Sequence, residues 1–76
     1  MAYNGHKNWN HWNVSLWLLN DEGLYRLVID LVQESATLDE AAISILQALK
    51  QNGLHHTPDG APYRRTSIRA ALKGLR

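Results

Sequence analysis

Histidines and paired carboxylates are the residues in this 76-residue chain whose types could support chemistry. His6 and His11 are separated by five positions, which is out of phase for two metal ligands on one helical face. His55 and His56 are adjacent, so their side chains point in different directions on most backbones. We therefore expect no metal site, a solvated loop around His55 and His56, and His11 as a polar neighbour of the nearby indoles.

Two acidic pairs, Asp21-Glu22 and Asp39-Glu40, are the remaining candidates for acid–base catalysis. Each pair stands where a helix is expected to begin, and acidic side chains there bind free backbone N–H groups and favour the helix dipole. The serines have no histidine or acid at a recognised motif spacing, and the chain has no glycine-rich phosphate loop. The sequence therefore predicts a protein that is not an enzyme and uses no cofactor.

Positive charge gathers in the C-terminal third of the chain. Residues 1–53 carry six acidic and three basic residues, a net charge of −3, whereas residues 54–76 carry one acidic and five basic residues, a net charge of +4. Four of these basic residues recur at spacings of four, four and three, which places them on one face of a predicted helix. With their two neighbours they are the predicted binding residues for nucleic acid or an acidic partner: Tyr63, Arg64, Arg65, Arg69, Lys73 and Arg76. The alternative is a solvated face whose aliphatic stems cover apolar neighbours.

All three tryptophans lie within residues 8–20. Trp9, Trp12, Leu16 and Leu19 follow spacings of three, four and three, which is one stripe of a helix. So much aromatic area in a short chain forms either the core itself or a core plus a docking surface for a partner. We expect Trp12 and Leu16 of this stripe to enter the core, and we assign Trp9 and Trp17 as anchors of a protein interface.

The chain must position these residues with short helices. Helices are expected over about residues 9–19 and 21–34, and a third is expected to begin at the capping box from Thr37 to Glu40 and to end at Asn52-Gly53. A last helix, capped by Thr66 or Ser67, should run to about Leu75. Between them, residues 54–65 form a loop around the β-turn signal Pro58-Asp59-Gly60, which leaves room for a short two-stranded ribbon with Tyr63 packing inward.

These elements predict an all-α fold, a small bundle of four short helices in a single domain over residues 1–76, with residues 1–7 as a flexible N-terminal arm. The absence of cysteine, of a long apolar run and of a signal peptide indicates a cytoplasmic protein with no membrane contact. The expected core consists of Trp12, Leu16, Leu27, Val28, Leu31, Ile45, Leu46, Leu49, Ile68 and Leu72.

The second half of the chain resembles a segment of large serine recombinases. In that family a helix ends in Asn-Gly, a Thr-Pro-x-Gly turn follows, and a Ser-x-x-Arg helix contacts DNA. This chain has Asn52-Gly53, then Thr57-Pro58-Asp59-Gly60, and then Thr66-Ser67-Ile68-Arg69 in its last predicted helix. The family usually has an aromatic residue after the turn, and Tyr63 stands there in this chain. No counterpart of the catalytic resolvase domain is present, so the resemblance implies DNA contact through Arg64, Arg65, Arg69 and Lys73 and not recombination.

The first part of the chain resembles a group of short, uncharacterised phage and mobile-element proteins. The resemblance covers residues 3–27 and rests on the string Asn8-Trp9, Trp12-Asn13-Val14 and Leu16-Trp17, with Asn10-His11 where the group often carries a glutamate. It implies a phage or mobile-element origin but supplies no activity. Small phage proteins without catalytic motifs often bind host machinery, and anti-CRISPR proteins are one such class.

Three hypotheses follow from the sequence. The first is a non-enzymatic phage or mobile-element protein that binds and inhibits a host defence nucleoprotein complex in the host cytoplasm, in the manner of anti-CRISPR proteins. The second is a small helix-turn-helix-like DNA-binding protein or regulator that uses the basic C-terminal helix. The third is a homo-oligomeric assembly protein, such as a homodimer, held together by the tryptophans.

Overall fold

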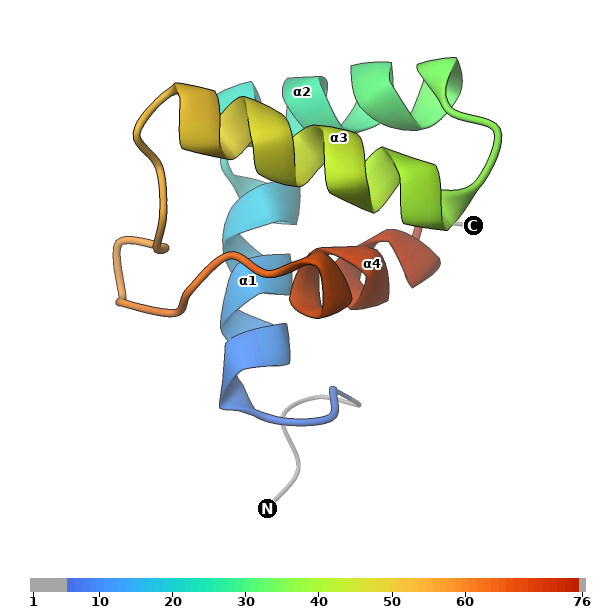
Figure 1. The fold of residues 1–76 in the computed structure, drawn as a ribbon. Coiled ribbons are helices and arrows are strands. Elements are labelled where there is room, and N and C mark those ends of the chain that lie inside the picture. The colour runs from blue at the N-terminus through green and yellow to red at the C-terminus, as the bar shows by residue number, and fades with distance from the viewer. Residues whose placement is uncertain (1–5, 76) are drawn as a thin grey trace.

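The computed structural model describes residues 6–75, and the predicted all-α architecture of four helices is confirmed. The helices are α1 (Trp9–Asn20), α2 (Glu22–Glu34), α3 (Leu38–Gln51) and α4 (Arg65–Lys73). Figure 1 shows α2 and α3 side by side, α4 below α3, and α1 running across the other three. Helix α1 packs against α2 and α4, and α3 packs against the same two helices, so the four surround one core.

The helix starts agree with the local capping signals. Asn8 accepts a hydrogen bond from the backbone N–H of His11 at the start of α1, and Asp21 accepts one from Leu24 at the start of α2. At α3, the Thr37 hydroxyl accepts the N–H of Glu40, whose carboxylate reaches back to the N–H of Ala36. After α3, Gly53 adopts a positive φ of 72°, the left-handed conformation that ends helices.

Helix α4 begins earlier than predicted. Arg64 is its N-cap, and both Thr66 and Ser67 lie inside the first turn. The Ser67 hydroxyl bonds backwards, accepting from the N–H of Arg64 at 3.2 Å and donating to the Arg64 carbonyl at 3.0 Å. The Ser67 hydroxyl therefore stabilises the start of the helix from a position inside the first turn, although Ser67 is not the N-cap residue. The helix also ends two residues before Leu75, at Lys73.

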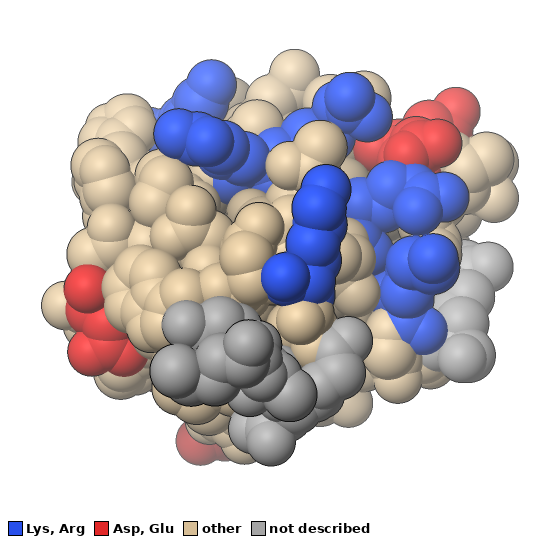
Figure 2. Space-filling model, turned by 90° about the horizontal axis from the view of Figure 1, so that it is seen from below, with Lys and Arg blue, Asp and Glu red and all other residues tan. Residues whose placement is uncertain are grey.

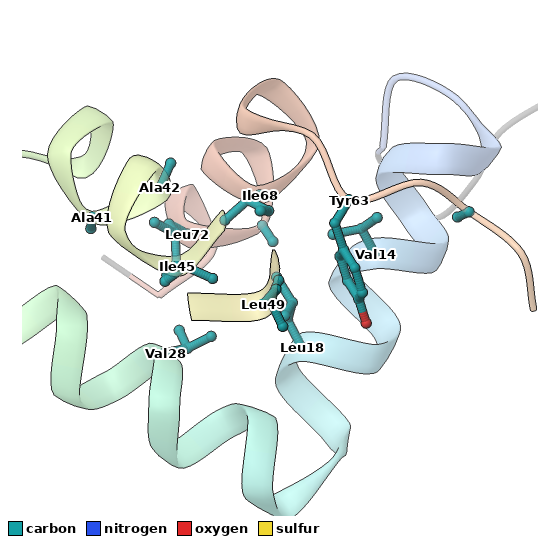
Figure 3. Packing of buried hydrophobic residues seen from close by; sticks show 12 residues of the cluster. Val14, Leu18, Val28, Ala41, Ala42, Ile45, Leu49, Tyr63, Ile68 and Leu72 are labelled. Atoms are coloured by element: carbon teal, nitrogen blue, oxygen red, sulfur yellow. The ribbon is translucent and has the colours of Figure 1, made fainter. Parts of the chain in front are cut away.

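The buried core takes one face from each helix. Figure 3 shows Val14 and Leu18 of α1 among side chains of the other helices. The buried hydrophobic residues are Val14, Leu18, Val28, Ala41, Ala42, Ile45, Leu49, Ala61, Tyr63, Ile68, Ala71 and Leu72. Half of the predicted core is in this set, and Leu27, Leu31 and Leu46 pack partly buried against it.

The predicted orientation of α1 is wrong. Leu16 is 37% exposed and Trp12 is only partly buried, outside the core cluster, while Val14 and Leu18 are inaccessible to solvent. Helix α1 is therefore rotated so that the stripe from Trp9 to Leu19 lies on the outer side and the narrower pair, Val14 and Leu18, lies inside.

A polar network fixes this rotation. Asn13, 1% exposed, accepts a hydrogen bond from the Thr57 hydroxyl and donates one to Asp59 at 2.9 Å. The same Asp59 oxygen accepts the indole N–H of Trp17 at 2.9 Å. Because Asn13 and Trp17 are one helical turn apart, both must face the Thr57 to Gly60 turn, and this places Val14 and Leu18 in the core.

The turn itself is the predicted β-turn. The N–H of Gly60 donates to the Thr57 carbonyl at 2.8 Å, and Gly60 has a φ of 98°, which only glycine adopts without strain. The two-stranded ribbon expected around it is reduced within residues 6–75 to a single antiparallel bridge between His56 and Pro62. Tyr63 packs inward as predicted, with 7% of its surface exposed.

Candidate functional site

The outer side of α1 carries an apolar stripe made of Trp9, Trp12, Leu16 and Leu19, called the outer stripe below. Trp9 is 38% exposed and Leu16 is 37% exposed, and the other two are partly buried. Helix α1 contains no Asp, Glu, Lys or Arg, so no formal charge interrupts the stripe. An uncharged aromatic and aliphatic surface of this kind is typical of sites that bind proteins.

Two shallow hollows flank Leu16 on the outer stripe. One has a volume of about 170 Å³ and is lined by His6, Trp12, Ser15, Leu16, Leu19 and Asn20. The other has a volume of about 210 Å³ and is lined by Leu16, Trp17, Asn20 and Asp21. Leu16 therefore lines both hollows, and side chains of a partner could insert on either side of it.

Trp17, predicted as an interface anchor, has its indole N–H committed to Asp59 at 2.9 Å. The hydrogen bond from Asn13, and after it this one from Trp17, stabilise the charged carboxylate and lower the pKa of Asp59 below its usual value. The ring lines a larger hollow of about 420 Å³, whose other residues are Asp21, Leu24, Leu54, His56, Pro58 and Tyr63. Trp17 thus joins the outer stripe to an apolar depression beside the β-turn.

Two residues of the predicted basic site are paired within the protein. Arg69 on α4 forms an ion pair with Asp39 in the first turn of α3, and the Arg65 guanidinium lies 4.0 Å from the same carboxylate. All three side chains are well exposed, so the pairing contributes little to stability. It nevertheless places one negative charge beside two positive ones and reduces the attraction of this part of the face for phosphates.

The other predicted basic residues differ in their placement. Arg64 and Lys73 are exposed, and within residues 6–75 neither has an ion-pair partner. Arg76 lies outside the described residues. Figure 2 shows Lys and Arg side chains spread over the face seen from below, with acidic residues at its margins.

Tyr63 does not belong to an exposed basic face. It is 7% exposed and packs in the core, and burial together with the nearby charge of Asp21 raises the pKa of its hydroxyl. Its ring is therefore not available to stack on a nucleic acid base, and the prediction that Tyr63 is a surface binding residue is wrong.

A polar hollow at the start of α1 escaped the sequence analysis. It has a volume of about 190 Å³ and is lined by Lys7, Asn8, Asn10, His11, Pro62, Arg64, Thr66 and Ser67. Lys7 was assigned to an N-terminal arm, and no local pattern brings it near Arg64. The hollow forms through a tertiary contact, because α1 and α4 pack together and residues from the starts of both helices line it.

Within the part of the chain that the structure describes, no three His, Cys, Asp or Glu side chains gather in a geometry that could hold a metal ion. None of the helices described is long and apolar enough to span a membrane.

Comparison with known proteins places the chain in one family. A family model described as "Family of unknown function (DUF7249)" matches residues 1–75, so the chain belongs to that family. No curated protein and no solved structure matches it.

Proposed function

We propose that this member of a family of unknown function is a non-enzymatic binding protein whose outer stripe docks on the protein component of a host defence nucleoprotein complex. The observation that carries the proposal is the outward orientation of the stripe. Two tryptophans and two leucines lie on one side of α1, and Trp9 and Leu16 expose more than a third of their surface.

The polar network at Asn13 sets this orientation, and the result is that apolar surface on the outer stripe stays in water. A chain of this size buries only about 60–65% of its extended-chain surface and needs every apolar contact it can make. Leaving Trp9 and Leu16 in water forfeits roughly 1–2 kcal/mol for each side chain that could otherwise be buried. A partner that covers the outer stripe recovers this free energy on binding, and tryptophan is among the residues that contribute most to interface affinity.

The surface also constrains the chemistry of the partner. Because α1 has no formal charge, the partner surface over the outer stripe should be apolar with few charged groups. The hollows on either side of Leu16 favour a partner that presents two protruding apolar side chains. The class of partner comes from the resemblance of residues 3–27 to phage and mobile-element proteins, many of which act on host machinery.

A matched pair of variants tests the proposal. Leu16→Asp places a charge in the middle of the outer stripe, whereas Ile43→Asp places one at an equally apolar and more exposed position on α3, 44% exposed. Tagged protein is used to capture a purified host defence complex, with and without nuclease treatment. We expect the wild type and Ile43→Asp to retain the complex after nuclease treatment and Leu16→Asp to lose it.

Two outcomes would overturn this function. If Leu16→Asp retains the complex as well as Ile43→Asp does, the outer stripe is not the docking surface. If light scattering shows a homodimer that Leu16→Asp dissociates, the stripe is covered by a second copy and the assembly hypothesis replaces the inhibitor hypothesis.

Direct DNA binding is the second candidate, and it is supported by Arg64 and Lys73, which are exposed and have no ion-pair partner among residues 6–75. Since Asp39 already pairs Arg65 and Arg69, we expect only a small number of phosphate contacts. The observed association constant for duplex DNA should then fall with salt with a shallow slope, roughly 0.9 per contact on a logarithmic scale. Replacing both Arg64 and Lys73 by Gln should remove the binding, and an unchanged affinity would exclude this face.

A further inference from the structure

The polar hollow at the N-terminal ends of α1 and α4 combines basic side chains from two distant parts of the chain. Lys7 and His11 come from the start of α1, and Arg64 precedes α4. The hollow has a volume of about 190 Å³, which is enough for a tetrahedral anion with water around it.

Among the residues that the structure describes, no negative side chain lines the hollow. Its lining contains Lys7, His11 and Arg64 but no Asp or Glu. This differs from the neighbouring face of α4, where Asp39 supplies a carboxylate to Arg65 and Arg69. The positive charges that line the hollow are therefore not offset by a carboxylate of the described lining, whereas those of Arg65 and Arg69 are partly offset by Asp39.

The state of His11 provides a second sign of unbalanced positive charge. Burial is the largest cause of its lowered pKa, and repulsion from Lys7 and then His6 adds to it. The groups that lie near the ring are thus cationic or proton-binding. A bound anion would reverse this balance, because it favours the imidazolium form that can donate hydrogen bonds from both nitrogens.

We propose that this hollow is a phosphate-binding site in which Lys7 and Arg64 supply the positive charges and His11 and Thr66 supply further hydrogen bonds. Arg64 can present two parallel N–H groups to a phosphate, and the exposed Thr66 hydroxyl lies in the same lining. The inference goes beyond the proposed function, because binding of a phosphate group in this hollow does not depend on whether the outer stripe docks on a protein.

The proposal is tested on the complete chain by following the histidine ring protons in NMR spectra as inorganic phosphate is added at constant ionic strength. We expect saturable binding that raises the pKa of His11, because the phosphate favours its protonated form. The ring resonances of His55, an exposed loop residue outside the hollow, serve as the internal control and should not move.

Charge variants then separate a site from general attraction. Lys7→Ala and Arg64→Gln should each weaken phosphate binding on the order of tenfold, the loss of one charge-assisted hydrogen bond. Lys50→Ala removes one positive charge from the exposed C-terminal turn of α3 and should leave the binding unchanged. No response of His11 to phosphate, or an equal loss in Lys50→Ala, would overturn the proposal.

The source of the phosphate is resolved by competition with single-stranded oligonucleotides that carry or lack a 5′-phosphate. Displacement of inorganic phosphate only by the 5′-phosphorylated strand would assign a phosphate monoester, and equal displacement by both strands would assign the nucleic acid backbone. Failure of the Leu16→Asp test leaves this titration unaffected, so the two proposals succeed or fail separately.

Discussion

The polar network between α1 and the β-turn makes a sharp prediction for Asn13→Ala. Asn13 is 1% exposed, and its amide oxygen accepts the hydroxyl hydrogen of Thr57, itself 4% exposed. Removing the amide leaves that buried hydroxyl without this acceptor, at a cost of about 1–3 kcal/mol. The small space that the amide leaves adds to this, and we expect a total loss of about 2–3 kcal/mol.

Such a loss is large for this chain, whose total free energy of unfolding is expected to be about 4–11 kcal/mol from its length. Urea unfolding followed by tryptophan fluorescence measures it, since Trp17 is hydrogen-bonded to the same network through Asp59. The matched control is Asn20→Ala on the same helix, because the Asn20 side chain is exposed and donates to the nearby Leu16 carbonyl. We expect the control to change the free energy of unfolding by less than about 0.5 kcal/mol.

A double-mutant cycle with Thr57→Val isolates the contact itself. If Asn13 and Thr57 stabilise the turn together, the two losses should fall short of additive by about 1 kcal/mol or more. An Asn13→Ala loss no greater than that of Asn20→Ala, or a cycle that is additive within about 0.3 kcal/mol, would refute the conclusion that this network sets the rotation of α1.

Three further outcomes follow from the same structure. Leu16→Asp should lower the free energy of unfolding by less than about 1 kcal/mol, whereas Leu18→Asp buries a charge and should prevent folding. Circular dichroism on heating distinguishes the two variants. An equal loss of stability in both would contradict the outward orientation of the outer stripe. Because the pKa of Asp59 is lowered in the folded protein, its carboxylate stabilises the fold above the unfolded-state pKa of about 3.9. This stabilisation is lost as the pH falls through the folded-state pKa. Asp59→Asn should therefore be less stable than wild type at neutral pH and equal to it in strong acid, and a difference that persists in acid would contradict this. Asp39→Asn should change stability by less than about 1 kcal/mol but release Arg65 and Arg69, so any DNA affinity should rise and become more salt-sensitive; an unchanged salt slope would show that the ion pairs do not mask this face.

The features predictable from the sequence are those that depend on near neighbours in the chain. The caps at Asn8, Asp21 and Thr37 each involve a residue three positions away, and the glycine after α3 acts within one turn. The same applies to the β-turn, whose closing hydrogen bond joins Thr57 and Gly60. Local residue type was sufficient for the number of helices and for most of their ends.

The rotation of α1 could not be predicted in this way, because two sets of residues on it follow helical spacing. Trp9, Trp12, Leu16 and Leu19 form the larger apolar set, yet Val14 and Leu18 are buried. Hydrophobic periodicity favours the larger set, whereas the structure is decided by Asn13, whose partner Thr57 lies 44 positions away. A polar residue between apolar neighbours, here Asn13, was the available signal for a buried network.

The candidate surfaces also depend on contacts between residues that are far apart in the sequence. The pairing of Asp39 with Arg69 joins two helices, and the sequence explained Asp39 fully by its place at a helix start. The hollow around Lys7 and Arg64 likewise forms only when α1 and α4 pack together. Residue spacing along one helix placed Arg65, Arg69 and Lys73 on α4, but it did not indicate that Arg65 and Arg69 lie beside Asp39.

Site-specific photo-crosslinking tests the docking role of the outer stripe most directly. A photoreactive side chain replaces Leu16 in one variant and the exposed Ile43 of α3 in the other, and each is irradiated with the purified defence complex after nuclease treatment. We predict a specific crosslink to a protein subunit from position 16 and none from position 43. Crosslinks from position 43 alone, or from neither position while the complex remains bound, would contradict docking through the outer stripe.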